Sequence, residues 1–216
     1  MAHFITIAGP MSAGKTAVME YLKKRYPSWI FVDEINPRTI TKNELIGAAQ
    51  TSEDLEKKVF SMDIKTLKKI GINKNVFVET GIFHHAYALR FFTKKDQRLF
   101  FRRYLEIYNR RPSFVIYIDT KPHVSWKRRK KKYADRIKKM GITDIGKTKA
   151  ELAKYKKILY EMYSNWTRCY DQVPVPKIVI KNSYKTERQF LKEVDKVIRS
   201  LISGKSPRQK NPRRRT

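Results

Sequence analysis

The sequence predicts an α/β fold in which a five-stranded parallel sheet is covered by helices on both faces. Two observations lead to this fold class. Apolar runs long enough for buried strands recur along the chain, and segments of helical spacing separate them. These runs do not alternate between apolar and polar residues, as half-exposed antiparallel strands do. The strands are expected at residues 4–8, 29–32, 76–78, 114–118 and 177–180.

A glycine-rich turn joins the first strand to the first helix. It fits the spacing G-x-x-x-x-G-K-[ST], and its residues are Gly9, Pro10, Met11, Ser12, Ala13, Gly14, Lys15 and Thr16. A loop with few bulky side chains lets several backbone N–H groups converge on one phosphate, and the following helix adds the positive end of its dipole. Lys15 then reaches the β- and γ-phosphates, and the Thr16 hydroxyl takes one position on Mg²⁺. The turn predicts binding of a nucleoside triphosphate, with ATP and Mg²⁺ as the expected cofactors.

Proline and capping signals place the next helices. Pro37 disfavours the helical conformation in the residue before it, so no helix is expected before Arg38. Residues 41–44 have capping-box spacing ahead of an apolar pair, which predicts one helix start. Residues 51–54 open a second helix, which is expected to end near Gly71.

The central part of the chain is expected to be mostly helical. After the third strand, helical spacing extends from about residue 83 to 108, with a break at residues 93–96. A basic helix is expected at residues 122–139. Gly141 and Gly146 are expected to break the chain after it.

Capping-box spacing marks the start of the last two long helices. Residues 148–151 precede an amphipathic pattern that continues to Trp166. Thr186 and Gln189 precede the helix after the fifth strand. The chain has no internal repeat, so a single domain is expected over residues 1–202.

Acidic residues follow three of the predicted strands. Asp33 and Glu34 follow the second strand, Glu79 follows the third and Asp119 ends the fourth. Ligands of parallel α/β sheets bind at the carboxyl ends of the strands, so these acids and the glycine-rich turn are expected on one rim. A phosphate-binding loop, a lysine and several carboxylates are the parts of a phosphoryl-transfer site.

Charge is the feature in which the composition departs from an ordinary globular protein. The formal net charge is +29 over 216 residues, and a basic block occupies residues 127–132. The tail, residues 203–216, holds six basic residues and no acidic one, and it is expected to be disordered. Attraction to nucleic acid and a merely solvated basic surface explain this charge equally well.

The composition also indicates the cellular compartment in which we expect the protein. The single cysteine, Cys169, excludes an intramolecular disulfide, which fits a reducing compartment. No apolar stretch approaches the roughly 18 residues of a membrane span, and residues 1–8 lack a charged leader. We expect a soluble cytoplasmic protein, or a nuclear one in a eukaryote if the basic tail is a targeting signal. The sequence leaves open whether the chain forms a homodimer.

The order of these pieces resembles the deoxynucleoside kinase family and, more distantly, thymidylate kinase. Residues 79–87, ETGIFHHAY, lie where that family has an acidic-Arg-Ser motif followed by a helix. Residues 114–132 resemble its strand and helix leading into an arginine-bearing lid, and residues 154–166 resemble its closing helix. The similarity spans roughly residues 3–200. It implies a P-loop NTPase fold with a basic helical lid, at about residues 127–146, and kinase activity that uses ATP and Mg²⁺.

By position, the resemblance gives roles to acidic and basic residues. Glu34 matches the general base for the acceptor hydroxyl, and Asp33 is the alternative because one register step exchanges the two. Glu79 would hold Mg²⁺, directly or through water. The arginines of the lid would close on the transferring phosphoryl group, and the candidates are Arg128, Arg129 and Arg136.

The sequence departs from the family on the acceptor side. Thr80 stands where the family has an arginine, and Arg38 could replace that arginine only if its loop folds inward. His84 and His85 could touch a substrate. Paired histidines at a helix start are more often structural, and no third ligand accompanies them for a zinc site.

A kinase acting on a nucleoside or nucleotide is therefore the expected function. Two alternatives stay open. The basic lid and tail would suit a kinase that acts on a nucleic-acid 5′ end, and Thr80 would suit a non-catalytic nucleotide-binding module associated with RNA.

Overall fold

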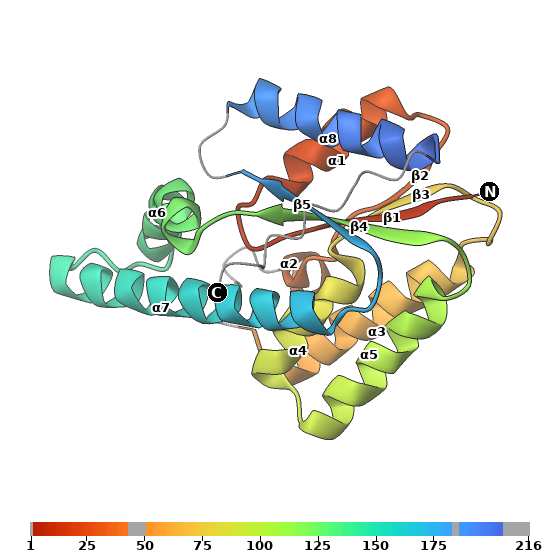
Figure 1. Ribbon diagram of the computed structural model, residues 1–216. Helices are drawn as coiled ribbons and strands as arrows, with labels where there is room; N and C mark the ends of the chain where they lie inside the picture. Colours follow the sequence, from red (N-terminus) through yellow and green to blue (C-terminus); the bar gives the residue numbers. More distant parts are fainter. Residues whose placement is uncertain (1, 43–50, 183–185, 205–216) are drawn as a thin grey trace, which may run out of the picture.

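A five-stranded, wholly parallel sheet forms the centre of the protein (Figure 1). The computed structural model describes residues 2–42, 51–182 and 186–204, apart from the side chains of Arg38 and Thr39. The strands lie side by side in the order β2-β3-β1-β4-β5. Their bounds are β1 Phe4–Ala8, β2 Ile30–Val32, β3 Val76–Glu79, β4 Ser113–Asp119 and β5 Lys177–Lys181.

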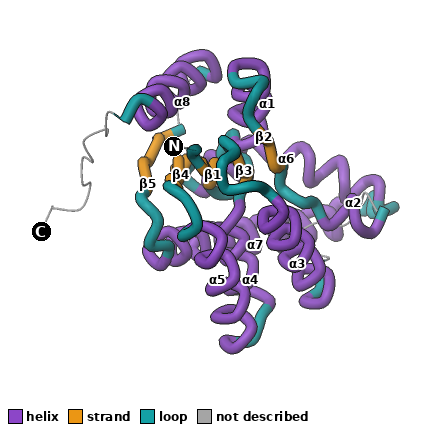
Figure 2. Tube along the Cα trace, turned by 90° about the vertical axis from the view of Figure 1, so that its right-hand side faces the viewer, coloured by secondary structure: helices purple, strands orange, loops and turns teal. Residues whose placement is uncertain are grey.

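Helices cover both faces of this sheet, as the sequence predicts. Figure 2 shows the strands as a row between two helical layers, with α1 and α8 on one side and α3, α4, α5 and α7 on the other. Figure 1 shows α6 beyond the ends of the strands, against α7. The helix bounds are α1 Lys15–Arg25, α2 Pro37–Thr41, α3 Glu53–Lys69, α4 His85–Phe91, α5 Lys94–Tyr108, α6 Pro122–Lys139, α7 Ile145–Gln172 and α8 Glu187–Ile202, with a short 3₁₀ helix, η1, at Gly81–His84.

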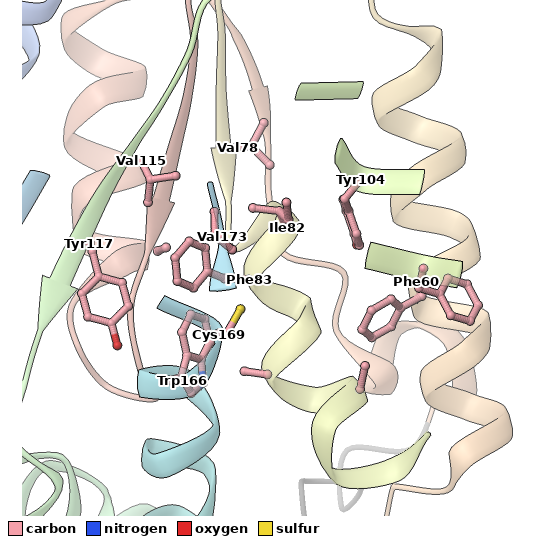
Figure 3. Packing of buried hydrophobic residues seen from close by; sticks show 14 of the residues in the cluster. Phe60, Val78, Ile82, Phe83, Tyr104, Val115, Tyr117, Trp166, Cys169 and Val173 are labelled. Atoms are coloured by element: carbon pink, nitrogen blue, oxygen red, sulfur yellow. The ribbon is translucent and has the colours of Figure 1, made fainter. Parts of the chain in front are cut away.

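Two apolar layers hold the helices to the sheet, because successive side chains of each strand point to opposite faces. Ile5 and Ile7 of β1 pack with α1 and α8, whereas Phe4 packs with the helices of the other face. Figure 3 shows the second layer, where Phe83 lies among Tyr117, Trp166 and Cys169. A fully buried side chain of this size contributes about 1.5–3 kcal/mol, so this layer fixes η1 and α7 firmly beneath the sheet.

Several predicted boundaries are confirmed. The long helical region breaks at Thr93, whose side chain accepts a hydrogen bond from the Asp96 N–H and so caps α5. Ser52 caps α3 in the same way. Thr186 and Gln189 form a complete capping box at α8.

Two predicted boundaries are wrong. Helix α2 begins at Pro37 itself, because the fixed φ of proline suits the first helical position, where its missing N–H costs nothing. Helix α7 begins at Ile145 rather than at residues 148–151, and Asp144 caps it by accepting from the Lys147 N–H. Gly146 therefore lies inside the first turn and does not break the chain. The helix start predicted from residues 41–44 falls largely outside the described residues.

Other expectations from the composition can be compared with the structure. Cys169 is buried and free, and burial raises the pKa of its thiol. Within the described ranges, no helix has both the length and the apolar character needed to cross a bilayer. Helix α8 ends at Ile202, and residues 205–216 of the basic tail lie outside the described residues.

Candidate active site

The P-loop (residues 9–16) joins β1 to α1 at the carboxyl edge of the sheet. Gly9 has φ +152° and Gly14 has φ +103°, and a Cβ on Gly9 would lie 2.5 Å from the carbonyl oxygen of Ile118. Glycine is the residue that tolerates both the conformation and the close approach. Lys15 turns back over the loop, where its Nζ donates to the Gly9 carbonyl at 3.0 Å. The loop can thus present backbone N–H groups, a lysine and a helix N-terminus to a phosphate.

Two carboxylates face the P-loop from neighbouring strands. Glu79 is the last residue of β3, and Glu34 follows closely after β2. The Thr16 hydroxyl donates to Glu79 Oε1 at 3.0 Å. Lys15 Nζ lies 3.6 Å from Glu34 Oε2. The strand order, with β3 between β1 and β2, is what brings both acids beside the loop.

The two carboxylates differ in their readiness to ionise. Burial raises the pKa of Glu79 despite the opposing charge of Lys15, and the charge of Glu34 adds to the rise. Burial also acts on Glu34, but the charges of Lys15 and His84 outweigh it and lower the pKa of Glu34. Glu34 is therefore a carboxylate at neutral pH, whereas Glu79 would gain most from a nearby cation.

Asp33 lies in different surroundings from its neighbour. Its carboxylate accepts from Lys23 Nζ at 2.8 and 2.6 Å on the exposed side of α1. Successive residues of an extended chain point to opposite sides, so the chain that directs Glu34 to the P-loop directs Asp33 to solvent. Asp119 ends β4, where Tyr163 donates to it at 3.4 Å.

The basic helix α6 contacts the P-loop through two of the three arginines named from the sequence. Arg129 Nε donates to Ser12 Oγ at 2.6 Å. Arg128 donates to the carbonyl oxygens of Ser12 and Asn182, at 2.9 and 3.0 Å. These contacts join α6 to the P-loop.

Arg136, the third of these arginines, makes no hydrogen bond to the P-loop within the described part of the chain. It lies two helical turns beyond Arg129 and is buried at 7% exposure. Lys132, one turn beyond Arg129, does line the cavity described next. The sequence could not separate these positions, because the whole block is basic and any of its residues could have faced the loop.

A cavity of about 400 Å³ opens beside the P-loop, and we call it the rim cavity. Pockets of this size suit a small ligand. Its walls come from the P-loop, α1, the segment after β2 with the start of α2, α3 and the residue before its cap, β3, η1, α4 and α6. The lining residues are Met11, Lys15, Thr16, Glu34, Ile35, Asn36, Pro37, Thr51, Glu56, Val59, Glu79, His84, Tyr87, Arg129 and Lys132.

Glu56 is a cavity residue that the sequence did not reveal. It lies in the first turn of α3, where an acidic residue is ordinarily explained by the helix dipole. Its side chain is only 4% exposed, and burial raises its pKa to about 7. The cavity thus has a carboxyl group that is partly protonated at neutral pH.

The two adjacent histidines point to different parts of the protein. His84 lines the rim cavity and lies within 3.8 Å of Glu34. His85 packs against Phe101, and burial lowers its pKa to about 4. Only the first of the pair belongs to the site.

Thr80 occupies the turn between β3 and η1. Its φ is +72° and its side chain is fully buried, an uncommon conformation for a β-branched residue. Its N–H donates to the Ile7 carbonyl at 3.0 Å. A buried threonine cannot supply the cationic group that an arginine would bring here. The side chain of Arg38, its suggested replacement, lies outside the described residues.

Comparison with known proteins decides between the classes of phosphate-binding protein that could carry such a site. The sequence profile of the deoxynucleoside kinase family matches residues 5–203. The chain belongs to the deoxynucleoside kinase family. It is an enzyme, a nucleoside or nucleotide kinase. Sequence comparison with curated proteins finds no match for this kinase.

Solved structures share the fold of this kinase at low sequence identity. The YorR protein of Bacillus subtilis, solved with phosphorylated GDP, is 13% identical with a TM-score of 0.57, over 93% of this chain and 98% of that chain. Deoxyadenosine kinase from M. mycoides, solved with dCMP and dCDP, is 16% identical with a TM-score of 0.52, over 91% and 98%. Thymidylate kinase from Ehrlichia chaffeensis is 14% identical with a TM-score of 0.54, over 92% and 100%. These likenesses show a P-loop kinase fold.

Proposed function

We propose that this kinase transfers the γ-phosphoryl group of ATP, bound with Mg²⁺, to a hydroxyl group of a nucleoside, and that Glu34 is the general base. The observation that carries the proposal is the position of Glu34. It is an ionised carboxylate that lines the rim cavity 3.6 Å from the P-loop lysine. A base in a kinase must lie where the acceptor hydroxyl meets the transferring phosphoryl group.

Thr16 and Glu79 are the residues that would hold Mg²⁺. The Thr16 hydroxyl and the Glu79 carboxylate are hydrogen-bonded at the foot of the P-loop, and oxygen ligands of this kind suit Mg²⁺. Burial raises the pKa of Glu79. A divalent cation bound there would lower this pKa again, because it favours the ionised carboxylate. The described residues contain no cluster of three or more metal-ligating side chains, so the nucleotide would supply further ligands. Bound Mg²⁺ neutralises phosphate charge.

Cationic side chains around the P-loop would hold the phosphates. Lys15, which donates to the Gly9 carbonyl in this structure, would turn to the β- and γ-phosphates. Arg129 and Lys132 line the same cavity from α6 and would contact the transferring group, since charge neutralisation supplies most of the catalysis in phosphoryl transfer. Arg128 would fasten the lid to the loop. We give Arg136 no catalytic role.

The walls of the rim cavity away from the P-loop favour an uncharged acceptor. Glu34, Glu56, Val59 and Tyr87 form these walls, and an acceptor phosphate there would face two carboxyl groups. A hydroxyl acceptor also needs a base, which a phosphate acceptor does not. As the acceptor oxygen bonds to the γ-phosphorus, its proton passes to Glu34, and the bond from that phosphorus to the bridging oxygen breaks to release ADP.

A turnover assay with ATP and Mg²⁺ tests this proposal. The panel contains nucleosides, nucleoside monophosphates and oligonucleotides with a 5′-hydroxyl end. We expect turnover on at least one nucleoside and little on the monophosphates. Faster turnover on a monophosphate would overturn the acceptor class. Turnover confined to oligonucleotides would instead support the kinase of nucleic-acid 5′ ends.

A further inference from the structure

A buried histidine connects the candidate base to the core of the protein. His84 is the last residue of η1, is 1% exposed and forms part of the cavity wall. The proposed function gives this side chain no role. Its two ring nitrogens nevertheless have separate sets of partners, and one of these partners is Glu34.

Two buried side chains hold the inner nitrogen of the ring. His84 Nδ1 lies 3.3 Å from Asp63 Oδ2 and 3.2 Å from the Tyr104 hydroxyl oxygen. The Tyr104 hydroxyl itself donates to Asp63 Oδ2 at 2.6 Å. Because that hydroxyl proton is already used, the Tyr104 oxygen and the Asp63 carboxylate can only accept, so Nδ1 is the protonated nitrogen. The orientation of the imidazole is thereby fixed from α3 and α5.

The outer nitrogen faces the candidate base. His84 Nε2 lies 3.8 Å from Glu34 Oε1, on the side opposite to the Lys15 contact with Oε2. A proton on Nε2 makes the ring an imidazolium between the carboxylates of Asp63 and Glu34. Asp63 is fully buried, and a buried carboxylate needs a compensating charge of this kind.

The groups around His84 favour this charged form. Burial alone would lower the pKa of His84, but the hydrogen bond and charge of Asp63, with the charges of Glu34 and Glu56, raise it. The titratable groups that face the ring come from several elements, namely Asp63 and Glu56 of α3, Glu34 after β2, Tyr87 of α4 and Tyr104 of α5.

Donor binding would leave Glu34 with one of its two cationic contacts. Lys15 is the side chain that turns to the phosphates of ATP, so its hold on Glu34 Oε2 weakens when the donor is bound. The contact with His84 persists, because its partners Asp63 and Tyr104 belong to the core.

We propose that His84 is a positioning residue for the candidate base. Held by Asp63 and Tyr104, its imidazolium keeps Glu34 directed at the acceptor hydroxyl while Lys15 engages the donor. His84 keeps its own proton throughout, and the acceptor proton goes to Glu34. The inference rests on the proposed role of Glu34.

A double-mutant cycle tests this coupling. The four proteins are the wild type, His84→Gln, Glu34→Gln and the double variant, each assayed for kcat and for the KM of ATP and acceptor. Misplacing a catalytic group costs up to about 10² in rate, so we expect His84→Gln to lower kcat by about tenfold or more and leave the KM of ATP unchanged. In the Glu34→Gln background the same change should have no further effect, because residues that act through one another are not additive.

Two further variants serve as a control and as an independent test. His85→Gln is the matched control, since His85 is also buried but packs against Phe101 outside the cavity, and it should leave kcat unchanged. Tyr104→Phe removes one partner of His84 while keeping the ring in the core. It should lower kcat in the same direction, to a smaller extent and only when Glu34 is present. It replaces His84→Gln in the cycle if that variant does not fold.

The outcomes separate this inference from the proposed function. An equal loss of kcat in both backgrounds would mean that His84 is merely structural, and would overturn the inference while leaving Glu34 as the base. Undiminished turnover in Glu34→Gln alone would overturn the proposed base, and the inference with it.

Discussion

Neighbouring residues of this kinase can have unrelated surroundings, and Asp33 and Glu34 are the clearest example. Asp33 is paired with Lys23 on the surface, whereas Glu34 lines the rim cavity beside Lys15. The sequence located this acidic pair at a strand end but could not choose between its members. Strand β2 is only three residues long, so it has no clear alternation from which the direction of the next side chain could be predicted.

Replacing each acid by its amide tests which one is the base. Glu34→Gln should lower kcat by roughly 10² or more with little change in ATP binding, because general acid–base groups contribute on this scale. Asp33→Asn should lose only the exposed ion pair with Lys23, which is worth about 1 kcal/mol or less. Steady-state kinetics of both variants provide the measurement. The opposite result, with kcat lost only in Asp33→Asn, would reverse the assignment.

Glu56 makes the stability of the fold depend on pH. Its pKa of about 7 in the folded protein exceeds the ordinary value of 4.5, so between these values the folded state holds a proton that the unfolded state has lost. Stability should therefore fall as the pH rises from about 4.5 to 7. Since one pKa unit corresponds to about 1.4 kcal/mol, Glu56→Gln should be more stable than wild type at pH 8, by up to about 3 kcal/mol.

Denaturant unfolding at pH 5 and at pH 8 measures this difference. Glu53→Gln on the same helix is the control, since Glu53 is only half-buried and is paired with Lys57. A Glu56→Gln effect of equal size at both pH values would show that the carboxyl group ionises normally in the fold.

Among the elements, helix α6 combines two tasks along its length. Its first half carries Arg128 and Arg129, which contact the P-loop. Its second half turns Tyr133, Arg136 and Ile137 into the protein, where Tyr133 stacks on Tyr155 of α7. The site takes Arg128, Arg129 and Lys132 from this helix, and the buried residues that follow Lys132 anchor it.

This division predicts different defects for two arginines of the same helix. Arg129→Ala should lower kcat by about 10² or more with little loss of stability, because a guanidinium at the transferring group acts mainly on the transition state. Arg136→Ala should lower the melting temperature and leave kcat near wild type in the folded enzyme. Kinetics and thermal melts of both variants, with Lys130→Ala as an exposed control, measure the two effects. A catalytic defect in folded Arg136→Ala would place it in the mechanism after all.

Local signals predicted the helices well where a side chain caps the helix and poorly where context decides. Thr186 caps α8 as expected, and Ser52 and Thr93 cap helices at the start and the break that the sequence predicts. The start of α7 was missed because Gly146, a usual helix breaker, is tolerated in a first turn capped by Asp144. His84 was noticed but not explained, since its partners Asp63 and Tyr104 come from distant parts of the chain.

At the scale of the whole molecule, the order of the strands determines which side chains meet beside the P-loop. No local sequence pattern shows this order. The continuous apolar runs predicted a parallel sheet, and the rule that ligands bind at carboxyl ends predicted which residues gather there. The order β2-β3-β1 then determines that Glu34 and Glu79 both reach the P-loop, while Asp119 on β4 contacts Tyr163 instead. Strand order follows from tertiary packing. The sequence could therefore predict which residues lie at the carboxyl edge of the sheet, but not which of them lie next to one another.

The basic tail allows the two explanations of the net charge to be tested on the whole molecule. Deleting residues 203–216 leaves α8 complete, so turnover on a nucleoside should stay nearly unchanged. If the tail binds nucleic acid, its deletion should weaken oligonucleotide binding and flatten the salt dependence. Each neutralised phosphate contributes a log–log slope of about −0.9 on duplex DNA and about −0.7 on single strands.

Oligonucleotide affinity at several KCl concentrations, for the full and shortened proteins, provides the measurement. Equal affinity and equal slope would leave the tail as a solvated segment. Loss of nucleoside turnover on deletion would place the tail within the catalytic domain.

The position of Cys169 provides a way to observe the molecule opening. It is the single thiol of the sequence, and it belongs to α7, where its side chain is buried beneath the sheet beside Phe83 (Figure 3). A thiol reagent can therefore modify the native protein only when α7 separates from this layer. The ring centroid of Trp166, on the same helix, lies 5.1 Å from Lys15 Nζ, so a ligand that moves the P-loop lysine also changes a contact of α7. The rate of thiol labelling with and without nucleotide thus reports how far substrate binding closes the interior of the enzyme, without any engineered probe.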